Sequence, residues 1–88
     1  MSNSIRDEKS QENKEKLFAL IKEAGYENYS QFCHDIGIDQ SNLYSNLDGT
    51  WKISVKRMFL IANSLGVSIT RILEIFFPEE YAENQKLL

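Results

Sequence analysis

Four glycines and one proline divide the sequence into short segments, and their positions constrain the fold more than any other feature. Glycine is common just after the last residue of a helix, and proline ends a helix because it lacks an amide hydrogen and clashes with the preceding turn. The segments that end at Gly25, Gly37, Gly49, Gly66 and Pro78 have the length of short helices. The sequence therefore predicts a bundle of short helices.

Apolar residues within these segments recur with the period of an α-helix. The first helix is predicted from about Glu12, with an apolar stripe of Leu17, Leu20, Ile21 and Ala24. Four further helices are predicted: one from the N-cap Asn28 to Gly37, one after the N-cap Asp39 to Gly49, one from Ser54 to Gly66 and one from Ser68 to Pro78. Since no segment shows the strict alternation of a half-buried strand, an all-α fold of five helices is expected.

The second and third predicted helices lie unusually close together in the chain. Asn28 is a good N-cap for the second helix, and Gln31 three residues later completes the pattern of a capping box. Only Ile38 and Asp39 separate Gly37 from the third helix, so the chain has to turn sharply there. A short turn that contains glycine between two short helices is typical of a helix-turn-helix.

The fourth and fifth predicted helices each carry one apolar face. In the fourth helix the face contains Val55, Met58, Phe59, Ala62 and Leu65. The fifth helix repeats the pattern, and its stripe contains Ile69, Ile72, Leu73 and Phe76. Both stripes predict helices that pack on a common core.

The length and composition exclude several classes of protein. A chain of 88 residues with 42% apolar residues fits one small globular domain, and no apolar run approaches the roughly 20 residues that span a bilayer. The polar N-terminus lacks the apolar segment of a signal peptide, so a cytoplasmic protein without membrane contact is expected.

The sequence offers little to metal, cofactor or enzyme chemistry. One cysteine, Cys33, excludes an internal disulfide, and with the adjacent His34 it provides no metal-ligand cluster. A buried apolar role for Cys33 and a solvent-facing position for His34 are expected instead. The chain has one histidine, no glycine-rich phosphate loop and no set of nucleophile and base, so we expect no enzyme, no metal and no cofactor.

The net charge of −3 argues against a general polyanion-binding protein, but the charge is unevenly distributed. Residues 28–66 contain equal numbers of basic and acidic side chains. All their positive charges fall close together, at Lys52, Lys56 and Arg57. This spacing predicts a local basic edge on an acidic protein.

The stretch NYSQFCHDIGIDQSNLYSNLDGTWKISVKRMFLIANSLGVSI resembles the Cro/cI-type (XRE, lambda repressor-like) helix-turn-helix DNA-binding family. The similarity covers about residues 12–77. The matching elements are Asn28, Phe32-Cys33, Ile36-Gly37-Ile38, Asp39, Ser41, Leu43, Asp48-Gly49 and Leu65-Gly66-Val67. The sequence departs from the family where Cys33 replaces the usual alanine and Tyr29 a frequent glutamine, and the third helix has no Arg or Lys.

The resemblance implies a five-helix lambda repressor-like domain over residues 12–77. Residues 1–11 would form a flexible N-terminal tail, and residues 78–88 a C-terminal extension for dimerisation. The implied function is that of a sequence-specific regulator of transcription, a phage-like repressor that binds double-stranded DNA as a homodimer on a palindromic operator.

In such a protein, residues 40–47 would lie in the major groove, with Leu43 and Leu47 anchoring the helix to the core. Amides and hydroxyls suit this role, since glutamine or asparagine can pair with adenine through two hydrogen bonds. The expected base contacts are Gln40, Ser41, Asn42, Tyr44 and Ser45. A polar, solvated helix face is the plainer alternative, although the absence of charge from residues 40–47 is unusual for one.

Two further sets of residues follow from the same reading. The expected phosphate contacts are Tyr29, Gln31, Thr50, Trp51, Lys52, Ser54, Lys56 and Arg57. The expected dimer contacts are Ile75, Phe77 and Tyr81. In the alternatives that stay open, Trp51 covers the core, Lys56 and Arg57 are only solvated, and Phe77 and Tyr81 fold back on the first helix.

A protein-interaction adaptor, or an antitoxin-like module with the same fold, is the alternative function. The acidic charge and the uncharged third helix favour it, whereas the basic cluster favours DNA. Its partner would be a protein such as a toxin or an antirepressor. The two functions differ in their response to salt, because DNA binding weakens steeply as salt is added.

Overall fold

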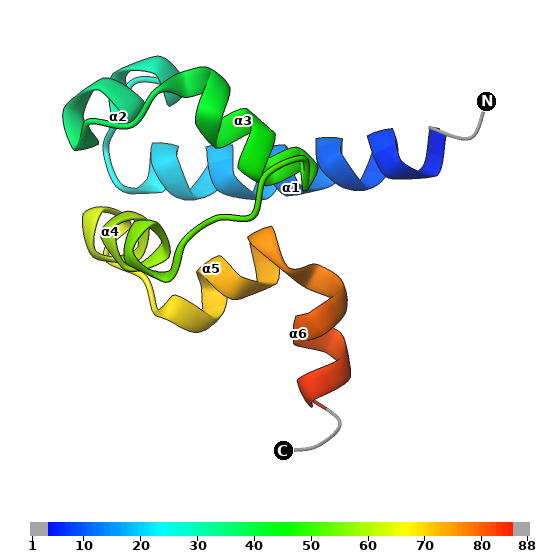
Figure 1. The fold of residues 1–88 in the computed structure, drawn as a ribbon. Coiled ribbons are helices and arrows are strands. Elements are labelled where there is room, and N and C mark those ends of the chain that lie inside the picture. The colour runs from blue at the N-terminus through cyan, green and yellow to red at the C-terminus, as the bar shows by residue number, and fades with distance from the viewer. Residues whose placement is uncertain (1–3, 86–88) are drawn as a thin grey trace.

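The computed structural model describes residues 4–85, and this part of the chain is entirely α-helical (Figure 1). The helices are α1 (Ser4–Glu23), α2 (Tyr29–Ile36), α3 (Gln40–Asp48), α4 (Val55–Leu65), α5 (Ile69–Phe76) and α6 (Pro78–Gln85). The predicted all-α fold is confirmed for these residues. Among them, no helix combines the length and apolar character needed to cross a membrane.

The two ends of the chain differ from the expectation. Helix α1 begins at Ser4 rather than Glu12, so it extends into the segment that was expected to be a flexible tail. Pro78 ends α5 as predicted, but it also begins a sixth helix that was not predicted. Proline suits the first position of a helix, where its missing amide hydrogen would have no partner in the helix.

The predicted N-caps Asn28 and Asp39 are confirmed, and Ser54, where the fourth helix was expected to begin, is the N-cap of α4. The side chains of Asn28, Asp39 and Ser54 accept hydrogen bonds from backbone amides at 2.8, 3.1 and 3.1 Å, respectively. At α2 the capping box is shifted by one residue, because Gln31 Oε1 accepts from the amide of Glu27 at 2.7 Å and not from that of Asn28. These bonds satisfy amides that have no partner within the helix.

A tight turn joins α2 to α3. Gly37 has a φ of 73°, a left-handed conformation that glycine adopts without the steric penalty of a side chain. The next amide, that of Ile38, donates to the carbonyl oxygen of Cys33 at 2.9 Å. The side chain of Ile38 is buried, so the turn is attached to the core. Asp39 then caps α3 directly.

The core lies between α1 and the helices on either side of it. Figure 1 shows α2 and α3 on one side of α1 and α5 on the other, and α1 contacts all three. The largest fully buried side chains are Phe32, Leu17, Ile21, Leu43, Ile61, Ile72 and Cys33. The expected burial of Cys33 is therefore confirmed, and His34 is exposed as expected.

The prediction for the apolar face of α4 was wrong at two positions. Met58, Ala62 and Leu65 are buried, but Val55 and Phe59 are exposed. Ile61 is buried instead of these two side chains, because α4 packs on the core with a face that is rotated from the predicted stripe.

Candidate nucleic-acid interface

The outer surface of α3 is uncharged and polar from Gln40 to Ser45. Leu43 and Leu47 are buried, as expected for the anchors of this helix. Gln40, Ser41 and Asn42 are exposed, and Ser45 is half-buried. The first turn of α3 thus presents three hydrogen-bonding side chains to solvent.

Gln40 is held by two residues at the start of α2. Its side-chain Nε2 donates to Ser30 Oγ at 2.9 Å, and its backbone carbonyl oxygen accepts from the Tyr29 hydroxyl at 3.0 Å. A side-chain amide has two N–H groups and one carbonyl oxygen. The bond to Ser30 uses one N–H group and leaves the other groups of the exposed amide for a ligand.

Tyr29 is buried, whereas a residue that contacts phosphate was expected to be exposed. Its side chain is only 8% exposed and its hydroxyl is used by Gln40. Burial raises the pKa of the Tyr29 phenol far above its ordinary value, and the neighbouring Cys33 adds to the increase. We therefore correct the expectation for Tyr29 and omit it from the contacts considered below.

Tyr44 faces α1 and α2 instead of standing on the outer surface of α3. Its half-buried ring stacks on Tyr29, with 4.5 Å between the ring centroids and an interplanar angle of 28°. The Lys14 ammonium lies 5.0 Å from the centroid of the Tyr44 ring and 3.3 Å from a carboxylate oxygen of Asp48. Because its ring has these contacts, Tyr44 is a weaker candidate for base contact than its neighbours.

The other flank of α3 is tied to the loop after it and to α4. Asn46 is buried; its Nδ2 donates to the carbonyl oxygen of Trp51 at 3.0 Å, and its Oδ1 accepts from Arg57 Nη1 at 3.1 Å. The amide of Trp51 in turn donates to the carbonyl oxygen of Ser45 at 3.2 Å. Both backbone groups of Trp51 are thus fixed.

The indole of Trp51 projects from this fixed loop and is 70% exposed. The interpretation of Trp51 as a cover on the core was therefore wrong. Next to it lies an open depression of about 320 Å³. The residues that line it are Asn42, Asn46, Trp51, Lys52, Ser54 and Arg57.

The loop after α3 and the start of α4 carry three basic side chains, Lys52, Lys56 and Arg57, and no acidic one. Lys52 and Lys56 are exposed, as are Thr50 and Ser54 from the same expected set of phosphate contacts. Gln31 is also exposed, at the start of α2. The predicted residues thus lie on both sides of α3, those of the loop and α4 on one and Gln31 on the other.

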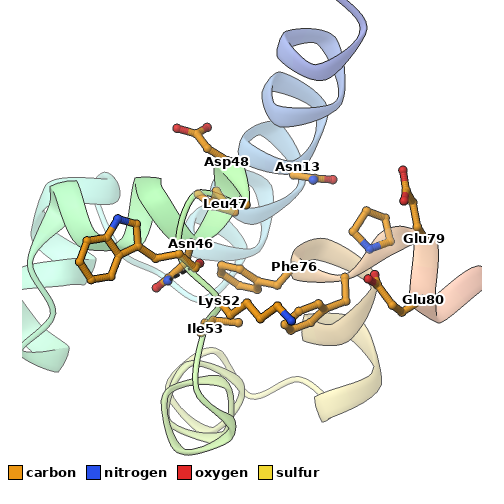
Figure 2. Close-up of a pocket in the computed structure, with 13 residues that line it drawn as sticks. Asn13, Asn46, Leu47, Asp48, Lys52, Ile53, Phe76, Glu79 and Glu80 are labelled. Atoms are coloured by element: carbon orange, nitrogen blue, oxygen red, sulfur yellow. Dashed lines mark hydrogen bonds between the residues drawn. The ribbon is translucent and has the colours of Figure 1, made fainter. Parts of the chain in front are cut away.

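A second depression, of about 310 Å³, lies between the end of α3 and the start of α6 (Figure 2). Its apolar lining includes the buried side chains of Leu47, Ile53 and Phe76. Asp48, Glu79 and Glu80 also line it, so carboxylates outnumber the single lysine there. This charge does not suit a nucleic acid, and we leave the second depression out of the candidate interface.

The residues expected at a dimer interface are largely absorbed by the fold. Ile75 is only 3% exposed and belongs to the core, so that expectation is corrected. Phe77 is half-buried against the core, and Tyr81 is half-buried on α6. Ile75 and part of Phe77 are thus used within the chain.

Three residues of the site were not identified from the sequence. Each of them contacts a residue at least 10 positions away in the chain: Ser30 contacts Gln40, Lys14 contacts Tyr44 and the buried amide of Asn46 contacts Arg57. The contact of Asn46 with the loop residue Trp51 is the exception. Local patterns carry no signal for such contacts. In the part of the chain that the structure describes, no group of histidine, cysteine and acidic side chains could hold a metal ion.

Comparison of the chain with models of protein families, with curated proteins and with solved structures gives no match. The site is therefore interpreted from its own geometry and from the resemblance described above.

Proposed function

We propose that the chain is a cytoplasmic, sequence-specific DNA-binding regulator of transcription. In this proposal, residues 12–77 form a helix-turn-helix domain of the Cro/cI type, and the protein acts as a phage-like repressor. The second helix of such a pair lies in the major groove, with its N-terminal residues against the base edges. Here that helix is α3.

The observation that carries the proposal is the arrangement of Gln40. It stands at the first position of α3, is exposed, and is oriented by its hydrogen bond to Ser30. The remaining N–H and the carbonyl oxygen of its amide match the N7 and N6 groups of adenine. Ser41 and Asn42 follow directly and extend the row of hydrogen-bonding groups.

The surface beside α3 supplies the groups that a phosphate backbone requires. Lys52, Lys56 and Arg57 lie in the loop and the first turn of α4, and Trp51 projects from the same loop. Contacts of this kind fix the position of a protein on DNA without reading its sequence. Because the charges are few and the net charge is −3, we expect weak and salt-sensitive binding by a single copy.

Two copies on a palindromic operator would compensate for this weakness. Dimeric helix-turn-helix proteins bind half-sites that are about one helical turn of DNA apart. The dimer stays part of the proposal, but Ile75 is no longer a contact in it, since its side chain is buried.

Binding to a labelled duplex of mixed sequence, measured by fluorescence anisotropy at several salt concentrations, tests the proposal. We expect the logarithm of the association constant to fall linearly with the logarithm of the salt concentration. Absence of binding even at low salt would contradict it.

A protein-interaction adaptor or antitoxin-like module is the second candidate. The observation that favours it is the complete absence of charged side chains from residues 40–47 on a chain with a net charge of −3. Its partner would be a protein such as a toxin or an antirepressor, and the α3 surface would then contact that partner instead of bases.

A further inference from the structure

The depression between the end of α3 and the start of α6 contains a polar group that the fold does not use. Asn13 of α1 lines this depression, and the residue is only 7% exposed. Within residues 4–85 its side-chain amide has no hydrogen-bond partner, yet the amide is not sealed from solvent. Figure 2 shows the amide extending from α1 toward the first turn of α6. Burial of an amide without a partner costs free energy, so Asn13 indicates that a ligand completes its hydrogen bonds.

The walls of the depression are largely apolar. Leu47, Ile53 and Phe76 are buried side chains of the lining, and the half-buried Phe77 joins them. The volume of about 310 Å³ is at the lower end of the range for small-molecule sites, about 300–1,000 Å³. The depression therefore suits a small ligand with an apolar body, which the amide of Asn13 would orient.

The charge of the lining selects the sign of the ligand. Its carboxylates belong to Asp48, Glu79 and Glu80, and its basic side chain to Lys52. Asp48 is paired with Lys14 at 3.3 Å, whereas Glu79 and Glu80 are exposed in the first turn of α6. Acidic residues at the start of a helix stabilise that helix by themselves, so the inference rests on their combination with the buried amide. Since no acidic group in the described chain could hold a metal ion, the depression favours an organic cation.

We propose that this depression binds a small organic amine. The apolar body of the amine packs on the buried apolar walls, and its ammonium group lies between Asn13 and the first turn of α6. An ammonium group has three N–H donors and no acceptor, so it donates to Asn13 Oδ1 and to the carboxylates of Glu79 and Glu80. A neutral ligand lacks this attraction, and an acid is repelled by the same carboxylates.

Titration of the DNA-free protein with amines, followed by nuclear magnetic resonance, tests the proposal. The probes are phenethylamine, cyclohexylmethylamine and isoamylamine, which join one ammonium group to apolar bodies of different shape. We expect saturable shifts of the Asn13 side-chain amide and the Trp51 indole at millimolar concentration, because both residues line the depression. Phenethyl alcohol and hydrocinnamate carry the same phenyl group without the positive charge, and we expect them to bind roughly fivefold more weakly than phenethylamine, or less.

Absence of saturable shifts with all three amines would overturn the proposal. Binding of the alcohol or the acid as tightly as phenethylamine would overturn it as well, since the charge would then have no part in recognition.

Variants of α6 test the role of the carboxylates. Glu79→Gln and Glu80→Gln are each expected to weaken phenethylamine binding about two- to fivefold. Glu83→Gln is the matched control, because Glu83 is exposed on the same helix but is not part of the lining. It changes the net charge equally and should bind the amine like the wild type. Equal affinities of all three variants would show only general attraction to an acidic protein and would overturn the site.

Asn13→Leu tests the role of the buried amide with two opposite readouts. The variant removes an amide without a partner, so its urea midpoint is expected to rise above that of the wild type. Its phenethylamine binding is expected to weaken roughly two- to tenfold, because one hydrogen bond to the ligand is lost. Asn13→Ala is the second variant if leucine lowers the helical content in circular dichroism. A folded variant that binds the amine as tightly as the wild type would overturn the assignment of Asn13.

Lys52→Ala separates this inference from the proposed function. Removal of the basic side chain of the depression is expected to tighten phenethylamine binding about two- to fivefold, whereas the same variant is expected to weaken DNA binding. Weaker amine binding by Lys52→Ala would contradict the proposed site. Because the titrations contain no DNA, failure of the protein to bind DNA would contradict the proposed function and leave this inference intact.

Discussion

Arg57 on α4 donates a 3.1 Å hydrogen bond from Nη1 to Oδ1 of Asn46 on α3. The same buried amide donates to the carbonyl oxygen of Trp51, so one side chain fixes α3, the following loop and the start of α4 relative to each other. The exposed indole and the basic residues of the candidate interface depend on this arrangement for their position.

Replacement of Asn46 by alanine is expected to destabilise the protein by roughly 1–3 kcal/mol, because it leaves partly buried hydrogen-bonding groups without partners. Asn42→Ala, on the exposed surface of the same helix, is the matched control and should change stability by no more than about 0.5 kcal/mol. Urea unfolding followed by circular dichroism measures both. Equal stability of the two variants would show that the Asn46 contacts contribute little.

Lys52→Ala and Lys56→Ala are expected to weaken DNA binding to a similar extent on every sequence, and each should reduce the salt slope by about one. Lys22→Ala is the control, since Lys22 is an exposed lysine in the last turn of α1. Anisotropy titrations at several salt concentrations provide the slopes. An equal effect of Lys22→Ala would mean that total charge, and not the basic edge, governs binding.

The stability of the protein is expected to fall as the pH rises above about 10, the ordinary pKa of tyrosine. Burial raises the pKa of Tyr29 in the folded state, so the unfolded chain loses this proton first and alkaline pH favours unfolding. The buried Cys33, whose pKa is also raised by burial, acts in the same direction, and its contribution begins at a lower pH, near the ordinary thiol pKa of about 8.5.

Tyr29→Phe isolates the tyrosine contribution to this pH dependence. The variant lacks the hydrogen bond to Gln40 and should lose roughly 0.5–1.5 kcal/mol at neutral pH. Its stability should then decline less steeply than that of the wild type between neutral and strongly alkaline pH. Unfolding curves at several pH values make the comparison, and parallel declines would contradict the assignment.

The helix boundaries within the chain were predictable because local chemistry sets them. Asn28, Asp39 and Ser54 cap helices through their own side chains, and Gly37 and Gly66 end helices in the left-handed conformation. Such bonds span only a few residues, so the sequence pattern contains all the participants.

The faces of the helices were less predictable, because tertiary packing decides them. Phe59 has the helical spacing of a core residue, yet the rotation of α4 leaves it half exposed and buries Ile61. Tyr29 resembles an exposed first-turn residue, yet its ring stacks on Tyr44 and its hydroxyl reaches Gln40. Neither outcome follows from residues next to it in the chain.

The most direct test of the account is selection of bound sequences from a random pool of duplex DNA, at low and at moderate salt. The wild type is compared with Gln40→Ala and with the matched control Gln11→Ala, which removes an exposed glutamine from α1. We expect a palindrome with half-sites about one helical turn apart. Gln40→Ala should lose roughly 1–3 kcal/mol of discrimination at one position of each half-site, whereas Gln11→Ala should select the wild-type sequence. No enriched sequence at either salt concentration, or an unchanged preference in Gln40→Ala, would contradict base recognition through α3.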